Sequence, residues 1–377
     1  LSWNGLESLG ELTVYDRTQP DEIAARIRGA GAVYVNKVAL DRETIFSAPD
    51  LKFIGVLATG YNVVDIAAAR ERGIAVCNIP TYGTAAVGQF AIAMLLEICH
   101  HVAHHSDAVH AGRWEQNADW CFWDYPLIEL AGKTMGIIGF GRIGQTTGRI
   151  ARALGMNVIA YDEYESGAGR ALAEYTALDA LFARSDVIAL HCPLLPSTQG
   201  IIDRENIAKM KDGVRVINMA RGGLVNNADM IAALQSGKVA RYVTDFPDNE
   251  ITLAPGVVAT PHLGASTPES EDNCAVMAAN QLKDFLENGN IKNSVNFPNV
   301  IMERSGVQRL CVIHRNIPAV IAQITTQLGA DGVNVENMTN KSKGEYAYTM
   351  VDAGSKVDES VIEDIRRVPG IIRMRVI

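Results

Sequence analysis

The sequence lacks the marks of several protein classes. Its six cysteines are scattered and include no Cys-X-X-Cys pair, so they predict reduced thiols in a cytoplasmic protein rather than a disulfide framework. No apolar run is long enough to span a bilayer, and the first residues do not form a basic-then-apolar leader, so no membrane partner is expected. Lys and Arg (34) are outnumbered by Asp and Glu (43), and the net charge of −9 argues against a nucleic-acid-binding surface.

The sequence does contain a regular alternation of apolar strands and helical segments. Its 377 residues are enough for two or three domains. The strands of the first 80 residues predict a parallel α/β domain, and a helical segment over about 84–111 follows them. A second run of strands predicts a doubly wound parallel sheet. The expected strands of the first domain are residues 32–35, 53–57 and 74–77, and those of the second are 157–161, 187–191, 214–218, 241–245 and 257–260.

The end of the chain has a different order of elements. A helix expected over 269–288 is followed by a stretch with Pro and Asn at 293–299, which we interpret as a return to the first domain and then a linker. Residues 306–377 then alternate as β-α-β-β-α-β. That order is typical of a ferredoxin-like module.

The most informative motif is the glycine-rich segment GIIGFGRIG at residues 136–144. Gly139 permits a tight turn out of a strand, Gly141 lets the backbone approach a pyrophosphate, and Gly144 lets the next helix pack closely. The N-terminus of that helix stabilises an anion. Because an apolar strand precedes the motif and a helix and second strand follow it, we favour a dinucleotide site over a glycine-rich turn in another βαβ unit.

Asp162 at the end of the second strand indicates which dinucleotide binds. A carboxylate at this position accepts hydrogen bonds from the ribose hydroxyls of NAD and repels the 2′-phosphate of NADP. Glu163 and Glu165 add negative charge, and no basic residue appears before Arg170. The sequence therefore predicts NAD.

Three residues beyond this motif are candidates for catalysis. Arg221 ends an apolar strand, so its guanidinium is expected in the crevice at the carboxyl ends of the strands, where it could hold a carboxylate; the alternative is an exposed surface Arg. His262 follows another strand and can give and take a proton near neutrality. Glu250 could pair with its imidazole, although taken singly it is an exposed loop carboxylate.

A group of four histidines lies in the helical segment, at His100, His101, His104 and His105. Histidines four residues apart share a helix face and could bind a metal. No carboxylate completes an H-E-X-X-H pattern, so we interpret the group as a polar helix surface and expect no metal.

Taken together, these motifs resemble the NAD-dependent D-2-hydroxyacid dehydrogenases over the first 300 residues. The resemblance implies a Rossmann domain at 95–267 inserted in a discontinuous, flavodoxin-like substrate domain at 1–94 and 268–299. It also implies that Arg221, Glu250 and His262 form the catalytic trio. The remaining implied contacts are, for the cofactor, Gly139, Gly141, Arg142, Ile143, Asp162, Cys192, Pro193, Thr198, Ala220, Asp245 and His262, and for the substrate, Lys37, Thr59, Gly60, Tyr61 and Arg221.

The tail resembles the ACT regulatory domain of the phosphoglycerate dehydrogenase subfamily, with matches at VIHRNIP (312–318) and GVNV (332–335). The resemblance implies L-serine binding at His314, Asn316 and Asn334, and a homodimer or homotetramer. It also implies oxidation of 3-phosphoglycerate to 3-phosphohydroxypyruvate in serine biosynthesis.

Two alternatives to that activity are open. The subfamily usually has an Arg after its second strand and a basic residue before the carboxylate loop, whereas this chain has Val35-Asn36-Lys37 and Val56-Leu57-Ala58. Its first half is more similar to glycerate dehydrogenase (hydroxypyruvate reductase), which acts on a substrate without phosphate. The other alternative is a non-catalytic NAD(H)-binding sensor. The presence of Arg221, Glu250 and His262 argues against this alternative.

Overall fold

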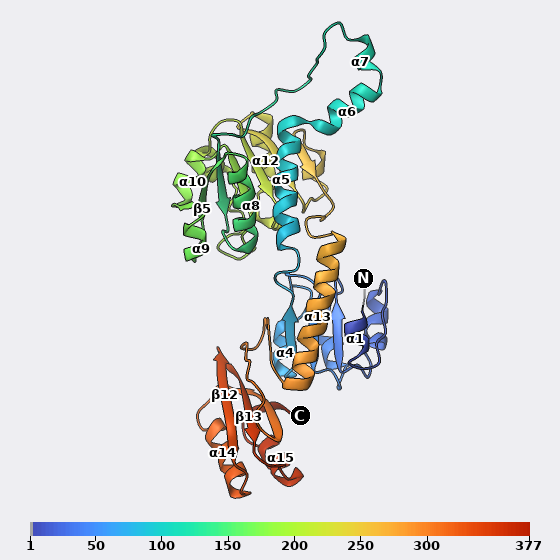
Figure 1. Ribbon diagram of the computed structural model, residues 1–377, viewed down its shortest axis with the longest axis vertical. Coiled ribbons are helices and arrows are strands. Elements are labelled where there is room, and N and C mark those ends of the chain that lie inside the picture. Colours follow the sequence, from blue (N-terminus) through green and yellow to red (C-terminus); the bar gives the residue numbers. More distant parts are fainter. Residues whose placement is uncertain (1–2) are drawn as a thin grey trace. The chain divides into compact units, whose positions relative to one another are not determined.

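The computed structural model describes residues 3–377, and the chain divides into two compact units (Figure 1). One unit is Gly83–Ser270, and the other combines the chain up to Tyr82 with Glu271–Ile377. The finer division into substrate, cofactor and ACT domains stays a prediction.

The unit 83–270 is built on a parallel sheet of seven strands in the order β10-β9-β8-β7-β4-β5-β6. The predicted doubly wound sheet is thus confirmed. The order reverses between β4 and β7, so a crevice opens at the carboxyl ends of these two strands, which is where ligands bind in such sheets. The strands are β4 (Thr134–Ile138), β5 (Asn157–Tyr161), β6 (Glu174–Tyr175), β7 (Val187–Leu190), β8 (Val214–Asn218), β9 (Val239–Thr244) and β10 (Val257–Ala259).

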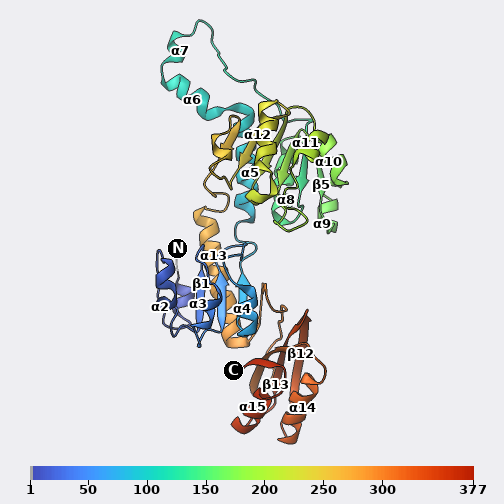
Figure 2. The ribbon, with the colours of Figure 1, turned by 180° about the vertical axis from the view of Figure 1, so that it is seen from behind.

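Helices cover both faces of this sheet (Figures 1 and 2). Residues of α5 and α8 form one apolar core with β4, and residues of α10, α11 and α12 form a second core on the opposite face. The helices are α5 (Thr84–His100), α6 (Val102–His110), α7 (Arg113–Gln116), α8 (Arg142–Ala153), α9 (Gly167–Arg170), α10 (Leu178–Arg184), α11 (Arg204–Lys209) and α12 (Asn227–Gln235).

The helical segment expected over 84–111 is interrupted. His101 has φ 49° and ψ 46°, a left-handed conformation that ends α5 and starts α6. Of the described residues, no single helix is long and apolar enough to cross a membrane. The bent pair α5 and α6, with 56° between its halves, meets that criterion jointly by length and composition alone.

The second unit begins with a parallel three-stranded sheet in the order β1-β2-β3. Asp41 and Asp65 start two of its helices, since each carboxylate accepts a backbone N–H of the first turn at 2.9 Å. Helix α13 continues from the other unit into this one. The elements are β1 (Ala32–Val35), β2 (Phe53–Val56), β3 (Ala75–Asn78), α1 (Asn4–Glu7), α2 (Ile23–Arg26), α3 (Arg42–Phe46), α4 (Ile66–Glu71) and α13 (Pro268–Asn288).

The C-terminal module has the expected β-α-β-β-α-β order and an antiparallel sheet arranged β12-β13-β11-β14. One face of the sheet packs on its own two helices. The other face, with Cys311 and Tyr348, packs against Phe53 and Phe285 of the three-stranded part. The elements are β11 (Gln308–Arg315), α14 (Val320–Ala330), β12 (Val335–Lys343), β13 (Tyr346–Ala353), α15 (Glu359–Arg366) and β14 (Ile371–Val376).

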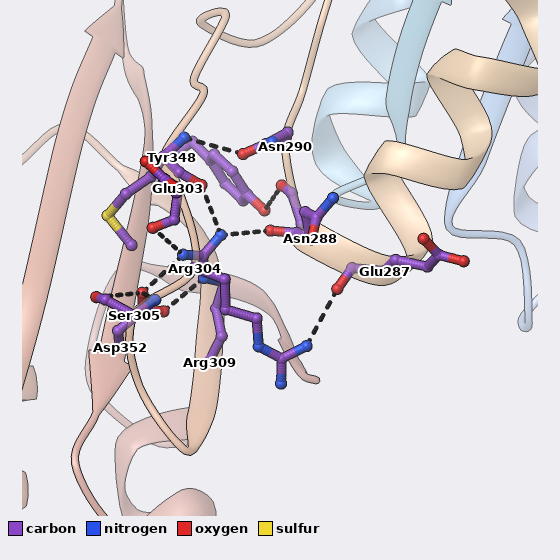
Figure 3. Close-up of polar contacts among 11 residues, drawn as sticks. Glu287, Asn288, Asn290, Glu303, Arg304, Ser305, Arg309, Tyr348 and Asp352 are labelled. Atoms are coloured by element: carbon purple, nitrogen blue, oxygen red, sulfur yellow. Dashed lines mark hydrogen bonds and ion pairs between the residues drawn. The ribbon is translucent and has the colours of Figure 1, made fainter.

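A buried ion pair inside this module also contacts the end of α13 (Figure 3). The side chains of Arg309 and Asp352 are fully buried, with Nε and Nη2 of Arg309 at 2.5 and 2.7 Å from the two carboxylate oxygens. The guanidinium also donates to the carbonyl oxygens of Asn288, Met302 and Glu303 at 2.7–2.9 Å. All donors of this guanidinium therefore face acceptors, as a buried charge requires.

Candidate active site

The glycine-rich segment forms the turn between β4 and α8. Gly139 has φ 91°, and a Cβ there would lie 2.4 Å from the backbone nitrogen of Cys192. A Cβ on Gly144 would lie 2.2 Å from the carbonyl oxygen of Gly139, so both positions exclude any side chain. A Cβ on Gly141 would meet nothing within 4 Å, which leaves open space in front of the N-terminus of α8. These features fit a pyrophosphate bound at a helix N-terminus.

Asp162 lies directly after β5 and is tied to this turn. Its Oδ2 accepts the backbone N–H of Phe140 at 2.7 Å, and its Oδ1 accepts that of Tyr164 at 2.9 Å. Each oxygen keeps a further lone pair for a ribose hydroxyl. The nearest cation along the chain, Arg170, is paired with Glu165 at 2.6 Å. The charge of this corner thus suits a ribose and opposes a 2′-phosphate.

The other wall of the crevice comes from the ends of β7 and β8. Cys192 is buried beside Gly139. In the loop that follows, the hydroxyl of Thr198 donates to the carbonyl of Pro193 at 2.6 Å and accepts the N–H of Leu195 at 2.8 Å, which fixes the loop.

His191, which the sequence did not single out, lies half-buried directly before Cys192. Its Nε2 lies 3.0 Å from the hydroxyl of Thr147. Burial lowers its pKa to about 4, so the imidazole is neutral at pH 7.

Arg221 follows β8 in a turn held by Asn218. The side-chain oxygen of Asn218 accepts the N–H groups of Ala220 and Arg221 at 3.0 and 3.3 Å, and its amide donates to the carbonyl of Arg221 at 2.8 Å. The guanidinium carbon lies 5.2 Å from the ring centroid of Phe246, within cation–π range.

His262 lies in a loop after β10 that Asp245 holds. The buried carboxylate of Asp245 accepts the hydroxyl of Thr260 at 2.6 Å and the N–H groups of Leu263 and Gly264 at 2.8 Å. His262 itself has φ 59°, an uncommon conformation for a residue other than glycine. Its ring centroid lies 4.4 Å from that of Phe246. The structure therefore brings Arg221 and His262 to one shared aromatic ring.

Glu250 lies exposed at the start of the 3-10 helix η3 (Ile251–Leu253), and its N–H donates to Asp248 Oδ1 at 3.0 Å. Its pairing with His262 stays a prediction. Arg142 and Ile143 open α8 beside the glycine-rich turn.

The substrate residues expected in the second unit lie at one edge of its sheet, where β1 and β2 end. Lys37, with φ 60°, is exposed two residues after β1. The loop with Thr59, Gly60 and Tyr61 follows β2, and the side-chain amide of Asn78 donates to the carbonyl of Thr59 at 2.6 Å. Asn78 is a positioning residue that the sequence did not single out.

The expected effector residues lie at or near the ends of β11 and β12. His314 is buried, with Nδ1 at 2.7 Å from the carbonyl of Arg315 and Nε2 at 2.8 Å from the hydroxyl of Thr349. Asn316 donates to the carbonyl of Gly344 at 3.1 Å, and Asn334 donates to Glu336 at 2.9 Å. Each of these side chains has an internal partner, so serine binding stays a prediction.

Three of the four histidines contact the segment that follows, and the ring centroid of His101 lies 4.3 Å from that of Tyr125. His104 lies 2.7 Å from a carboxylate oxygen of Asp124, which Arg113 also contacts at 2.7 Å, and His105 Nε2 accepts the N–H of Asp124 at 3.2 Å. Within residues 3–377, no group of three or more His, Cys, Asp and Glu side chains is arranged to hold a metal ion.

Comparisons with known proteins identify the family. Residues 92–264 match the model of the D-isomer specific 2-hydroxyacid dehydrogenase, NAD binding domain. The chain is 55% identical over 307 residues to a hydroxypyruvate reductase of Blautia hydrogenotrophica, covering 78% of this chain and 95% of that protein. It is 32% identical to D-3-phosphoglycerate dehydrogenase 1 of Saccharomyces cerevisiae, and the match covers 94% of this chain and 79% of the yeast protein.

A solved structure gives the same result for the fold. The D-lactate dehydrogenase of Aquifex aeolicus, complexed with NAD and lactic acid, is 27% identical with a TM-score of 0.68, covering 78% of this chain and 95% of that chain. The chain belongs to the D-2-hydroxyacid dehydrogenase family, and it is an NAD-dependent enzyme of that family. The predictions of family and cofactor are thus confirmed.

Proposed function

We propose that this enzyme reduces hydroxypyruvate, or a similar small 2-keto acid without phosphate, with NADH. The observation that carries the proposal is the 55% identity to a hydroxypyruvate reductase, which extends over nearly all of that protein. The residues at the substrate edge support it. Apolar Leu57 and Ala58 follow β2, and among the expected substrate residues of the second unit Lys37 alone is positively charged, so a phosphate would find a single cation there.

In the proposed reaction, bound NADH supplies the hydride. Arg221 binds the keto acid through its guanidinium, which matches a carboxylate or carbonyl oxygen. His262 gives the proton that the new hydroxyl group requires, and Glu250 keeps the imidazole in its protonated form. Asn218 and Asp245 hold the turns that carry Arg221 and His262.

The substitution His262→Ala tests this assignment. The variant should lose about a thousandfold or more in kcat with hydroxypyruvate, in keeping with loss of a general acid. Its affinity for NADH, followed by fluorescence titration, should stay within about threefold of the wild type because the dinucleotide turn is unaltered. A variant with near wild-type kcat would refute His262 as the proton donor, and lack of turnover of any keto acid by the wild type would favour a sensor.

Oxidation of 3-phosphoglycerate is the second candidate. It is favoured by one observation, namely that similarity to the yeast D-3-phosphoglycerate dehydrogenase covers 94% of this chain and so includes most of the C-terminal module. This candidate predicts faster turnover of 3-phosphohydroxypyruvate than of hydroxypyruvate, and inhibition by L-serine through His314, Asn316 and Asn334. Lys37 would then contact the phosphate, and Lys37→Ala should raise KM for the phosphorylated substrate alone.

A further inference from the structure

Phe246 contacts both side chains to which the proposed reaction assigns positive charge. The guanidinium carbon of Arg221 lies 5.2 Å from its ring centroid, and the imidazole centroid of His262 lies 4.4 Å away with an interplanar angle of 50°. The residue is half-buried two residues after the end of β9, directly after Asp245. It joins the loop that carries His262 to the turn that carries Arg221.

The backbone of Phe246 is fixed on both sides. Its N–H donates to the hydroxyl of Thr244 at 3.1 Å, and Pro247 follows it. Its carbonyl oxygen lies 3.0 Å from the position that a Cβ on Gly222 would take, so the turn after Arg221 packs tightly against this residue. The backbone that carries the ring is therefore held next to the turn of Arg221.

We propose that Phe246 is a positioning residue that holds Arg221 and His262 in their catalytic arrangement, an inference that rests on the proposed function. The face of an aromatic ring attracts a guanidinium or an imidazolium and has no such attraction for a neutral imidazole. The ring thus restrains the Arg221 side chain for binding the keto acid. It also favours the protonated form of His262 that donates the proton.

Of the charged groups assigned to the surroundings of His262, Arg221 is the one that contacts the ring. Asp245 is occupied by donors of the loop itself, Arg221 contacts the ring, and Glu250 starts η3. Replacing the ring with an aliphatic side chain removes no charge, and a released Arg221 would raise the pKa of His262, whereas loss of the cation–π contact lowers it. A change in the pH dependence of such a variant would therefore report on the ring.

The test compares Phe246→Leu, Phe246→Met and Phe246→Tyr in keto-acid reduction with NADH. Loss of the ring should lower kcat/KM about tenfold, which corresponds to about 1.4 kcal/mol, with part of the loss in KM for the keto acid. The reduction activity falls as pH rises because the proton donor is lost, and the midpoint of that fall should move to lower pH by about half a unit. Phe246→Tyr keeps the ring and should restore both values.

Phe90→Leu is the matched control, because Phe90 is also half-buried in the same unit but lies in α5 and packs against the apolar core. It should leave kcat, KM and the pH midpoint unaltered. NADH binding and thermal unfolding check that each variant folds, and Phe246→Met supplies a second variant without the ring, with a flexible unbranched side chain, if Phe246→Leu unfolds. A folded variant without the ring, but with the wild-type pH midpoint, would overturn the proposal even if kcat fell. Retained turnover in His262→Ala would instead overturn the proposed function.

Discussion

Arg309→Met should loosen the C-terminal module from the end of α13. The substitution leaves the Asp352 carboxylate without its cation at a site where the side chain is fully buried. Breaking a buried pair in this way costs about 3–5 kcal/mol, and three carbonyl oxygens lose a donor as well. We expect the free energy of opening of the module to fall by about 4 kcal/mol.

Hydrogen–deuterium exchange of amides in β11 and β13, read by mass spectrometry, measures that opening directly. The double variant Arg309→Met/Asp352→Leu should recover part of the loss because it removes the unpaired charge. Turnover of hydroxypyruvate should stay near the wild-type value, since all the catalytic candidates lie in the other unit. A free energy of opening in Arg309→Met that lies within about 1 kcal/mol of the wild-type value would refute this account of the ion pair.

The same pair predicts a dependence on pH. Burial opposes ionisation of Asp352, but hydrogen bonds from Arg309 and Ser305 lower its pKa below the ordinary value. A carboxyl group with a lowered pKa contributes stability that is present above its unfolded pKa and lost as pH falls. Protection of the module should therefore decrease below about pH 4 in the wild type, and this part of the decrease should be absent in the double variant.

Further predictions concern the cofactor, the His262 loop, acid stability and the tail. Asp245→Asn puts an amide N–H₂ against N–H donors, so kcat should fall about thirtyfold, or 2 kcal/mol, in steady-state assays; an unaltered kcat would contradict its role. Asp162→Ala should raise KM for NADH about tenfold and reduce the preference of the enzyme for NADH over NADPH. An unchanged preference would show that Asp162 does not determine the choice of cofactor. Because burial lowers the pKa of His191 to about 4, the unfolded state binds a proton that the native state does not; the free energy of unfolding should decrease by about 3 kcal/mol between pH 6.5 and 4, and less in His191→Gln. Asn334→Ala should abolish any inhibition by L-serine and spare catalysis; persisting inhibition would place the effector elsewhere.

The strands could be predicted from the sequence because apolar runs mark them directly. The strands at 32–35, 157–161 and 214–218 begin and end where the sequence places them, and the parallel sheet follows from the alternation with helices. Strand β6 was missed because Glu174–Tyr175 is only two residues long and has no apolar run. The interruption at His101 was missed because a helical pattern continues on both sides of it.

The site was predictable in part for the same reason. Residues that follow parallel strands meet at one edge of a sheet, so the positions of Asp162, Arg221 and His262 could be inferred from strand ends. The contacts of Phe246 and the internal partners of His314 depend on the paths of loops and on packing between elements, which no local pattern encodes. Arg309 and Asp352 are 43 residues apart in the sequence, so no local pattern could predict their buried ion pair either.

The most direct test of the proposed function is the ratio of kcat/KM for hydroxypyruvate to that for 3-phosphohydroxypyruvate, measured with NADH under identical conditions. The proposal predicts a ratio above about ten, because a phosphate finds no Arg at the substrate edge. A ratio below one, with inhibition by L-serine, would contradict it and establish the phosphorylated substrate instead.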